Sequence, residues 1–386
     1  MANAITMIAI TELFFISLSP NGLNRNAKLR IAKRSYEYCK GLIFFRIILN
    51  KNRRKKIRMF VSGEKKMINN LYSAGKAGII TCILFSHFMG LAQPLPRAEL
   101  NFRSDNDLYL FNKQDQYYTN GIFFNIRKAA DSTQLSAKEA NRLWGITVGQ
   151  KMYNAYTAQI RYIEEVDRPI TAYLFVAADL DRYFTNESYL SFSVELGTIG
   201  QRALGRQFQE SIHKVLKLYD IAGWQYQLKN AAGLDASVQY GGLLYRNKAH
   251  WLDLSAYAEA ILGLNHTGLS VAPTLRLGRI NPLYQSALTS SRLQVNGSTA
   301  NNELFFYYTP QLRFVGYDAT LQGGMFLHDK GPVTYTPSRW VLYHQFGIAY
   351  ANRLVTLRMQ YIFYSKEVPG MFFRHRYGSV GMSYRF

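Results

Sequence analysis

The sequence predicts an all-β protein, a transmembrane antiparallel β-barrel of about 12 strands with a short helix in an extracellular loop. The first observation is a series of segments of about ten residues or more in which polar and apolar side chains alternate, as in barrel strands that face lipid and lumen in turn. The second is an aromatic content of 15% with 28 tyrosines, because aromatic side chains suit pleated, half-buried surfaces. The third is that no stretch after residue 93 approaches the apolar run of about 18 residues that a transmembrane helix requires.

The alternating segments begin near residue 98 and continue to the end of the chain. Within 191–195, for example, the apolar Phe192 and Val194 alternate with polar neighbours. Successive side chains of a strand point to opposite faces, so each segment presents one apolar and one polar face. Strands are expected near 98–111, 117–128, 141–151, 170–184, 188–199, 231–246, 250–264, 268–278, 302–316, 338–350, 353–365 and 375–386.

The connections between these segments are short at one end and long at the other. Short turns at 185–187, 247–249 and 351–352 follow the fourth, sixth and tenth segments, whereas long connections follow the third, fifth and ninth. Short turns face the periplasm in outer-membrane barrels, which places both termini there. The long link at 279–301 follows the eighth segment and departs from this rule, and the sequence offers no reason for it.

The first 92 residues differ in composition from the rest. Residues 1–66 carry 15 Lys and Arg against 3 acidic residues, so about 12 of the 21 net positive charges lie there. Residues 67–92 have a Lys-bearing start, an apolar run and small residues before Gln93, the layout of a secretory signal peptide. We expect 1–66 to be a non-native or disordered N-terminal extension, 67–92 a signal peptide and 93–386 an outer-membrane β-barrel enzyme domain. The alternative is an N-terminal membrane anchor.

Three further features favour a barrel over a soluble β-sandwich, whose strands would also alternate. Both cysteines, Cys39 and Cys82, precede Gln93, so a chain that starts there has no disulfide and no thiolate chemistry. The chain ends in SVGMSYRF, and a last strand closing on an aromatic residue such as Phe386 is typical of outer-membrane barrels. The signal-like segment agrees with both observations.

The stretch SDNDLYLFNKQDQYYTNG at 104–121 gathers more oxygen ligands than a hairpin tip requires. With a hairpin centred in this stretch, Asp107 lies opposite Thr119 and Asn106 opposite Asn120, with opposed Cβ atoms about 5 Å apart. Carboxylate, amide and hydroxyl oxygens suit a hard cation such as Ca²⁺. Asn and Asp are also ordinary turn formers, so the pattern alone leaves both interpretations open.

The connection at 200–230 is long for a compact domain, and such loops are usually functional or disordered. An imidazole in it, that of His213, could act as a general base near neutral pH, although a lone His on a helix is more often structural. An amphipathic helix is expected, with apolar positions Phe208, Ile212, Val215 and Tyr219 and a polar face of Gln209, His213 and Lys217.

Four stretches together resemble one family. SDNDLYLFNKQDQYYTNG, DRPITAYLF at 167–175, GTIGQRALGRQFQESIH at 197–213 and GWQYQLKN at 223–230 are similar to those of the outer-membrane lipid A deacylases, the calcium-dependent lipid A 3-O-deacylases. The similarity extends over 98–386. It implies a twelve-stranded barrel that hydrolyses the ester holding the 3-position acyl chain of lipid A in the outer leaflet. Tyr219 departs from the family, since an acidic residue occupies this position in at least one member.

The resemblance also implies site residues. The catalytic set falls on Asn106, Asp107, Thr119 and His213. His213 would deprotonate a water, while Ca²⁺ held by Asp107 and Asn106 would polarise the ester carbonyl and stabilise the oxyanion. Substrate contacts are expected from Arg168, Lys214, Lys217 and Gln209, the three cations as donors to lipid A phosphates, although a solvated loop charge is the more common role for any single one of these cations.

Other classes of function are weighed against this one. A phospholipase acting on glycerophospholipids would use the same ester chemistry, and a passive porin would use the same barrel. Nucleic-acid binding is not expected, because the basic run precedes the predicted mature chain and lacks an interleaved aromatic face. The expected partners are lipopolysaccharide, as substrate, and outer-membrane lipids, and we expect a monomer in the bacterial outer membrane.

Overall fold

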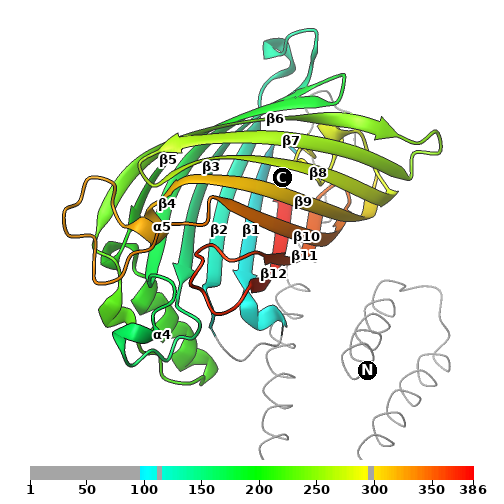
Figure 1. The fold of residues 1–386 in the computed structure, drawn as a ribbon. Coiled ribbons are helices and arrows are strands. Elements are labelled where there is room, and N and C mark those ends of the chain that lie inside the picture. Colours follow the sequence, from blue (N-terminus) through cyan, green and yellow to red (C-terminus); the bar gives the residue numbers. More distant parts are fainter. Residues whose placement is uncertain (1–95, 111–114, 294–299) are drawn as a thin grey trace, which may run out of the picture. The chain divides into compact units, whose positions relative to one another are not determined.

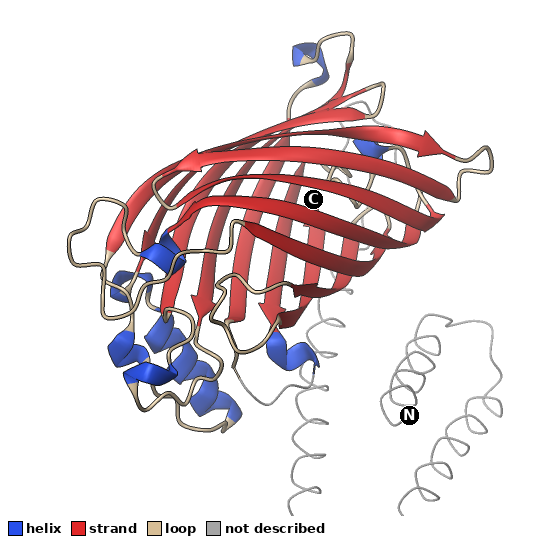
Figure 2. Ribbon diagram, in the orientation of Figure 1, coloured by secondary structure: helices blue, strands red, loops and turns tan. Residues whose placement is uncertain are grey.

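The computed structural model describes residues 96–110, 115–293 and 300–386; the expected extension and signal peptide lie outside them. These residues form a closed barrel of twelve antiparallel strands, in which β12 returns to pair with β1 (Figures 1 and 2). The predicted fold class is therefore confirmed, and none of the described helices is long and apolar enough to cross a bilayer. The strands are β1 Ala98–Asn106, β2 Tyr118–Ala129, β3 Glu139–Tyr153, β4 Thr171–Phe184, β5 Ser188–Ile199, β6 Ala231–Arg246, β7 Leu252–Gly263, β8 His266–Arg279, β9 Glu303–Asp318, β10 Trp340–Ala351, β11 Val355–Tyr364 and β12 His375–Arg385.

The two faces of the barrel wall differ as the alternation predicts. Lipid offers no hydrogen bonds, so an outward apolar band and an inward polar face are the arrangement that a membrane barrel needs. The exposed apolar side chains of the strands include Leu100, Phe102, Phe124, Ile126, Trp144, Ile146, Val148, Phe192, Val194, Leu196, Leu269, Val271, Leu304, Phe306, Met359 and Val380. The buried polar ones include Glu99, Ser104, Asp105, Asp181, Asp235, Asp253, Ser255, Thr274, Arg276, Thr309, Ser379 and Ser383.

The connections follow the predicted division between the two ends. The links after β4, β6 and β10 are short, and those after β3, β5 and β9 are long. The predicted helix in the long loop after β5 is α4, at the lower left of Figure 1. One link at this end is short, because only two residues separate β7 from β8. The helices are η1 Asp107–Leu110, η2 Ser132–Gln134, η3 Ile163–Glu165, η4 Gln201–Ala203, α4 Gly205–Leu216, η5 Trp224–Tyr226, η6 Leu283–Gln285 and α5 Ala319–Gln322.

The long link after β8, which the sequence leaves unexplained, runs inside the barrel. Its main-chain oxygens accept hydrogen bonds from lumen-facing side chains of distant strands: Arg127 of β2 donates to Ser290 at 3.0 Å, and Tyr183 of β4 donates to Thr289 at 2.8 Å. The link is therefore long because it has to cross the lumen, and it does not form a hairpin turn.

Barrel closure between β1 and β12 is reinforced by a buried ion pair. The Arg385 guanidinium, which is 1% exposed, donates to Glu99 Oε2 at 2.5 Å and to Thr356 Oγ1 at 2.9 Å. It also donates to the main-chain oxygens of Asn352 and Arg353. One side chain thus joins β1, β11, β12 and the β10–β11 turn.

Replacing Arg385 by Met is expected to destabilise the barrel by about 3–5 kcal/mol, because Glu99 is left buried and unpaired. The measurement is urea unfolding of the detergent-solubilised protein, followed by heat-modifiable gel migration. Arg97→Met is the matched control. Arg97 pairs with Asp131, and both side chains are more than half exposed, so the control should lose no more than about 1 kcal/mol. Equal losses in the two variants would contradict a closing role for Arg385.

Candidate functional site

The hairpin of β1 and β2 has the pairing that strand parity predicts. Asn106 pairs with Asn120, and the Thr119 hydroxyl donates to Asp107 Oδ1 at 3.3 Å. The Gln116 N–H donates to the other oxygen, Oδ2, at 2.8 Å. The strand ends at Asn106, and η1 turns the Asp107 carboxylate back over the hairpin.

Two carboxylates meet at this rim. Asp107 is 1% exposed, and burial, followed by the negative charge of Asp115, raises its pKa well above the ordinary value. A buried carboxylate beside a second carboxylate is costly unless a cation or a proton neutralises the pair. The oxygens of Asp107, Asp115 and Thr119 are hard ligands of the kind that Ca²⁺ uses, so the donor set fits such an ion.

Asn106 is placed differently from the metal-ligand role expected for it. Its side-chain oxygen accepts the Leu108 N–H at 2.7 Å, which caps the first turn of η1. The amide oxygen therefore positions the backbone that carries Asp107. To bind a metal ion, this oxygen would either have to coordinate the ion while it keeps the hydrogen bond, or give the hydrogen bond up.

Helix α4 brings His213 to the hairpin. Phe208, on its apolar side, packs against a buried cluster that includes Trp224 and Ala172. A Cβ atom at Gly205 would lie 2.4 Å from the Ala172 side chain, so the first turn can approach β4 this closely only with glycine there. The helix is therefore fixed against the barrel wall, and its polar side faces the rim.

Both ring nitrogens of His213 have partners. Nδ1 lies 2.7 Å from the main-chain oxygen of Tyr219, and Nε2 lies 2.7 Å from Asp115 Oδ2. A carbonyl oxygen can only accept, so Nδ1 carries a proton and donates it. The imidazole is thereby held with Nε2 toward the carboxylate pair.

Asp115 is a residue of the candidate site to which the sequence reasoning assigned no role. The Gln209 amide donates to the same Asp115 Oδ2 at 2.8 Å, and the Asp115 N–H donates to the Tyr219 hydroxyl at 2.9 Å. Burial and the Asp115 charge raise the pKa of that hydroxyl, so it stays protonated. The available signal was the position of Asp115 within the oxygen-rich stretch, but its partners are about a hundred residues away in the sequence.

The DRP motif supports the hairpin from the side. Asp167 Oδ2 accepts the Tyr117 hydroxyl at 2.6 Å and the Phe372 N–H at 2.9 Å, and Oδ1 accepts the Tyr156 N–H at 2.9 Å. Burial and the hydrogen bond to Asp167 raise the pKa of the Tyr117 hydroxyl, which keeps it a donor. One carboxylate thus joins three loops around Tyr117, the residue that precedes β2.

The four expected substrate contacts divide into two groups. Arg168 is fully buried, donates to Glu367 at 2.9 Å and to Thr320 at 3.1 Å, and lies over the Tyr153 ring. This placement argues against a contact with lipid A phosphates, since the charge of Arg168 is already paired inside the loops. Gln209 is 3% exposed, and its amide oxygen accepts the Trp224 indole N–H at 2.8 Å. The buried Gln209 therefore holds Asp115 in place through its side-chain amide.

Lys214 and Lys217 are exposed. They lie at the C-terminal end of α4, near His213 in the sequence and on the same rim. Of the expected cationic contacts, these two are the ones that a phosphate outside the barrel can reach.

A second ionisable group lies inside the barrel wall. Glu195, Asp235 and His266 each place one ligand atom within 4.8 Å of the others. His266 Nδ1 lies 2.9 Å from Asp235 Oδ2, and the Tyr173 hydroxyl donates to Glu195. This donor set could hold a cation, and sequence reasoning did not single it out. Its members have protein partners, however, in the hydrogen bonds between His266 and Asp235 and between Tyr173 and Glu195.

Comparisons with known proteins agree with this architecture. A family model described as outer membrane protein LpxR matches residues 79–386. The solved structure of LpxR from Salmonella typhimurium is 19% identical, covers 75% of this chain and 100% of its own, and superposes with a TM-score of 0.61. No curated protein matches the chain.

Other solved barrels are more distant. The β-domain of the Bordetella autotransporter BrkA is 13% identical, covers 76% of this chain and all of its own, and has a TM-score of 0.39. The translocator domain of NalP from Neisseria meningitidis is 10% identical, covers 82% and 98%, and has a TM-score of 0.38. Such scores carry no argument about function, whereas the family model matches residues 79–386 and so contains the whole of the described barrel. The chain belongs to the LpxR family of outer membrane proteins.

Proposed function

We infer from membership of this family that the protein modifies lipid A in the outer membrane. We propose that it hydrolyses the ester of the 3-O-linked acyl chain, with His213 as general base and Ca²⁺ as cofactor. The observation that carries the proposal is the position of His213 Nε2, 2.7 Å from Asp115, whose negative charge in turn acts on the buried carboxylate of Asp107. A base and a cation-binding acidic pair are the two elements that such an ester hydrolysis uses.

Each residue has a defined task in this scheme. Tyr219 holds the proton on Nδ1, so that Nε2 is the nitrogen that takes a proton from water. Asp115 occupies that position in the described arrangement, so its carboxylate has to move away before water reaches Nε2. Asp107, with Asn106 and Thr119 beside it, would hold Ca²⁺, which when bound supplies a positive charge that stabilises the ester oxyanion.

The two alternatives are unequal. A phospholipase would share base and cation, so only a substrate comparison separates it from a lipid A deacylase. A passive porin would leave the rim cluster without a purpose, and the link across the lumen gives it no support. We therefore keep the phospholipase as the competing activity.

His213→Ala is expected to lower deacylation by roughly 10²–10⁴-fold, the usual contribution of a general base. The measurement is mass spectrometry of purified lipid A after incubation with the protein in calcium or in chelator. His328→Ala, in an exposed loop, is the control and should retain full activity. A parallel incubation with glycerophospholipid tests the phospholipase alternative. Undiminished lipid A deacylation by His213→Ala would refute the proposed base.

Asp107→Asn is expected to abolish stabilisation by calcium, which for the wild type should reach about 2.7 kcal/mol at a hundredfold excess over Kd. In chelator, where calcium cannot offset its charge, the ionised Asp107 carboxylate destabilises the folded protein. Because the pKa of Asp107 is raised above 3.8 in the folded protein, its contribution to stability is present below that pH and is lost as the pH rises through the folded value. Wild type should therefore lose stability over this window in chelator, and the variant should lose less. Thermal unfolding between about pH 4 and 8 measures both effects, and unchanged calcium stabilisation would remove Asp107 from the metal site.

Replacing Lys214 and Lys217 together by Ala is expected to raise KM for lipid A by about 3–10-fold with little change in kcat, because exposed charges contribute modestly to binding. Lys248→Ala, in the β6–β7 turn at the other end of the barrel, is the charge-matched control. Steady-state kinetics on lipid A with and without its phosphates would show the effect only for the phosphorylated substrate. An equal effect on both substrates would mean that the two lysines do not contact phosphate.

A further inference from the structure

The link between β8 and β9 is hydrogen-bonded to strands on the far side of the lumen. From β2, Arg127 donates to the Ser290 oxygen at 3.0 Å; from β4, Tyr183 donates to the Thr289 oxygen at 2.8 Å. From β3, Asn141 donates to the Ser291 oxygen at 3.3 Å. These strands lie on the opposite side of the barrel order from β8 and β9. The link therefore spans the lumen from wall to wall.

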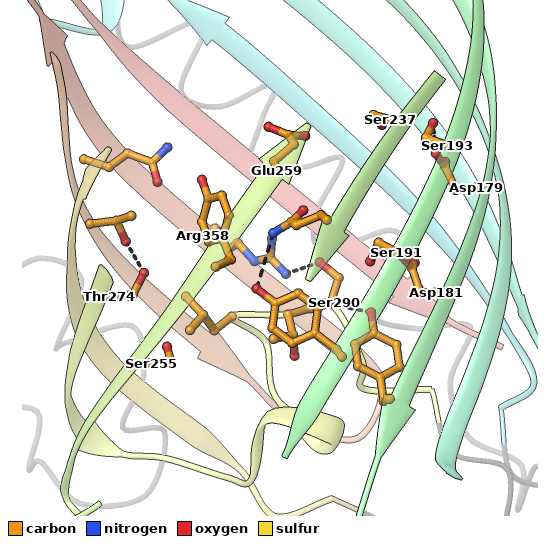
Figure 3. A pocket seen from close by; sticks show the side chains of 18 of the residues that line it. Asp179, Asp181, Ser191, Ser193, Ser237, Ser255, Glu259, Thr274, Ser290 and Arg358 are labelled. Atoms are coloured by element: carbon orange, nitrogen blue, oxygen red, sulfur yellow. Dashed lines mark hydrogen bonds between the residues drawn. The ribbon is translucent and has the colours of Figure 1, made fainter. Parts of the chain in front are cut away.

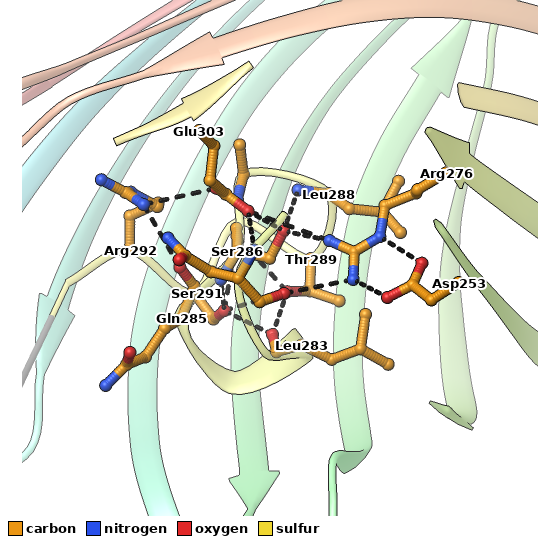
Figure 4. A network of polar contacts seen from close by, with 12 residues as sticks. Asp253, Arg276, Leu283, Gln285, Ser286, Leu288, Thr289, Ser291, Arg292 and Glu303 are labelled. Atoms are coloured by element: carbon orange, nitrogen blue, oxygen red, sulfur yellow. Dashed lines mark hydrogen bonds and ion pairs between the residues drawn. The ribbon is translucent and has the colours of Figure 1, made fainter. Parts of the chain in front are cut away.

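Buried charges hold the link where it leaves β8 and where it enters β9 (Figure 4). Arg276 is unexposed and pairs with Asp253 at 2.5 Å, and it donates to the Ser286 hydroxyl at 2.6 Å. Glu303, also unexposed, accepts that hydroxyl at 2.9 Å and pairs with Arg292 at 3.3 Å. Each charge therefore has an opposite charge and further hydrogen bonds, which is the condition for a buried ionic network to be stable.

Other strands and turns at this end of the barrel also form hydrogen bonds with the link. The Arg358 guanidinium of β11 donates to the Ser290 hydroxyl at 2.7 Å. The Leu283 N–H donates at 2.8 Å to Glu187 of the β4–β5 turn, and Glu187 pairs with Arg246 at 2.5 Å. The β4–β5 turn and strand β11 are thus both bound to the link.

Apolar contacts complete the anchoring. Ala287 is unexposed and packs with Phe305 and Ala349, while Leu293, also unexposed, packs with Leu143 on the opposite wall. The link is therefore fastened at both walls by side chains that water does not reach.

We propose that residues 280–293 form a fixed plug that seals the barrel lumen at the end where the chain terminates. A mobile gate would need an open state of similar free energy. Withdrawal of this plug would leave Asp253, Arg276 and Glu303 without their present surroundings and would break several buried hydrogen bonds, each costly to lose. The closed state is thus the native state of the lumen, independently of the chemistry at the rim.

The plug closes the lumen at one end. A cavity of about 490 Å³ lies next to the plug inside the lumen, and Leu288, Thr289 and Ser290 of the plug are part of its lining (Figure 3). Asp179 and Glu259 line its walls. A polar cavity of this size suits ordered water, and the plug prevents it from acting as a path across the membrane.

Planar-bilayer conductance of the protein purified from outer membranes tests the seal. Wild type should give no discrete channels over the voltage range that the bilayer tolerates. A variant in which a short Gly-Ser linker replaces residues 283–300 should conduct more than about tenfold above wild type, while heat-modifiable migration confirms that its barrel is folded. Discrete channels in wild type, or a folded linker variant that stays closed, would overturn the proposal.

A milder variant covers the case in which the linker protein does not fold. Tyr183→Phe with Arg358→Met keeps the link but removes two of its fastenings, and it should show brief openings that wild type lacks. Ser237→Ala, in the same lumen but away from the plug, is the control and should stay closed. Closure of the folded double variant as complete as that of the control would count against the plug. Lipid A deacylation by each variant should match wild type, because no rim residue has changed.

Discussion

The constraint on which the rest of the structure depends is the pairing of backbone hydrogen bonds in a medium that offers none. A sheet in lipid has no tolerable edge, so β12 must return to β1, and the wall must present apolar side chains outward on every strand. The inward side chains are then polar by the same alternation. Closure and alternation together create a polar lumen that the protein has to fill or seal, and they leave two rims whose loops are free of the lipid constraint.

These two rims differ in how they treat buried charge. At the end where the chain terminates, each buried carboxylate has an arginine beside it: Glu99 pairs with Arg385, and Asp253 pairs with Arg276. At the other rim Asp107 faces Asp115, and among the described residues the cationic partner of this pair is a histidine that is charged only when protonated. Two neighbouring carboxylates, one of them buried, that share no permanent positive charge cost stability, and such an unbalanced pair is more typical of a functional site than of a structural one.

The sequence could predict the features that depend on local pattern, but not those that depend on contacts between distant parts of the chain. Strand positions and the pairing of Asn106 with Asn120 depend on alternation and parity, which are local properties of the chain. The burial of Arg168 could not be predicted in this way, because its partner Glu367 lies about two hundred residues further on. The path of the β8–β9 link was equally hidden, since its length is visible in the sequence but the walls that hold it are not.

The separation of seal and site explains why a barrel of this size serves as an enzyme scaffold. The hairpin, α4 and the loop containing Asp167 are joined by hydrogen bonds at one rim, whereas the plug is fastened to the wall at the other. The pairing of β1 with β2, which extends to Asn106 and Asn120, holds Asp107 and Thr119 in register without any contribution from the plug. In the proposed scheme, the loops move by the small distance that takes Asp115 away from His213, and the barrel that carries these loops does not change. A channel would need the opposite distribution, with a mobile lumen and inert rims.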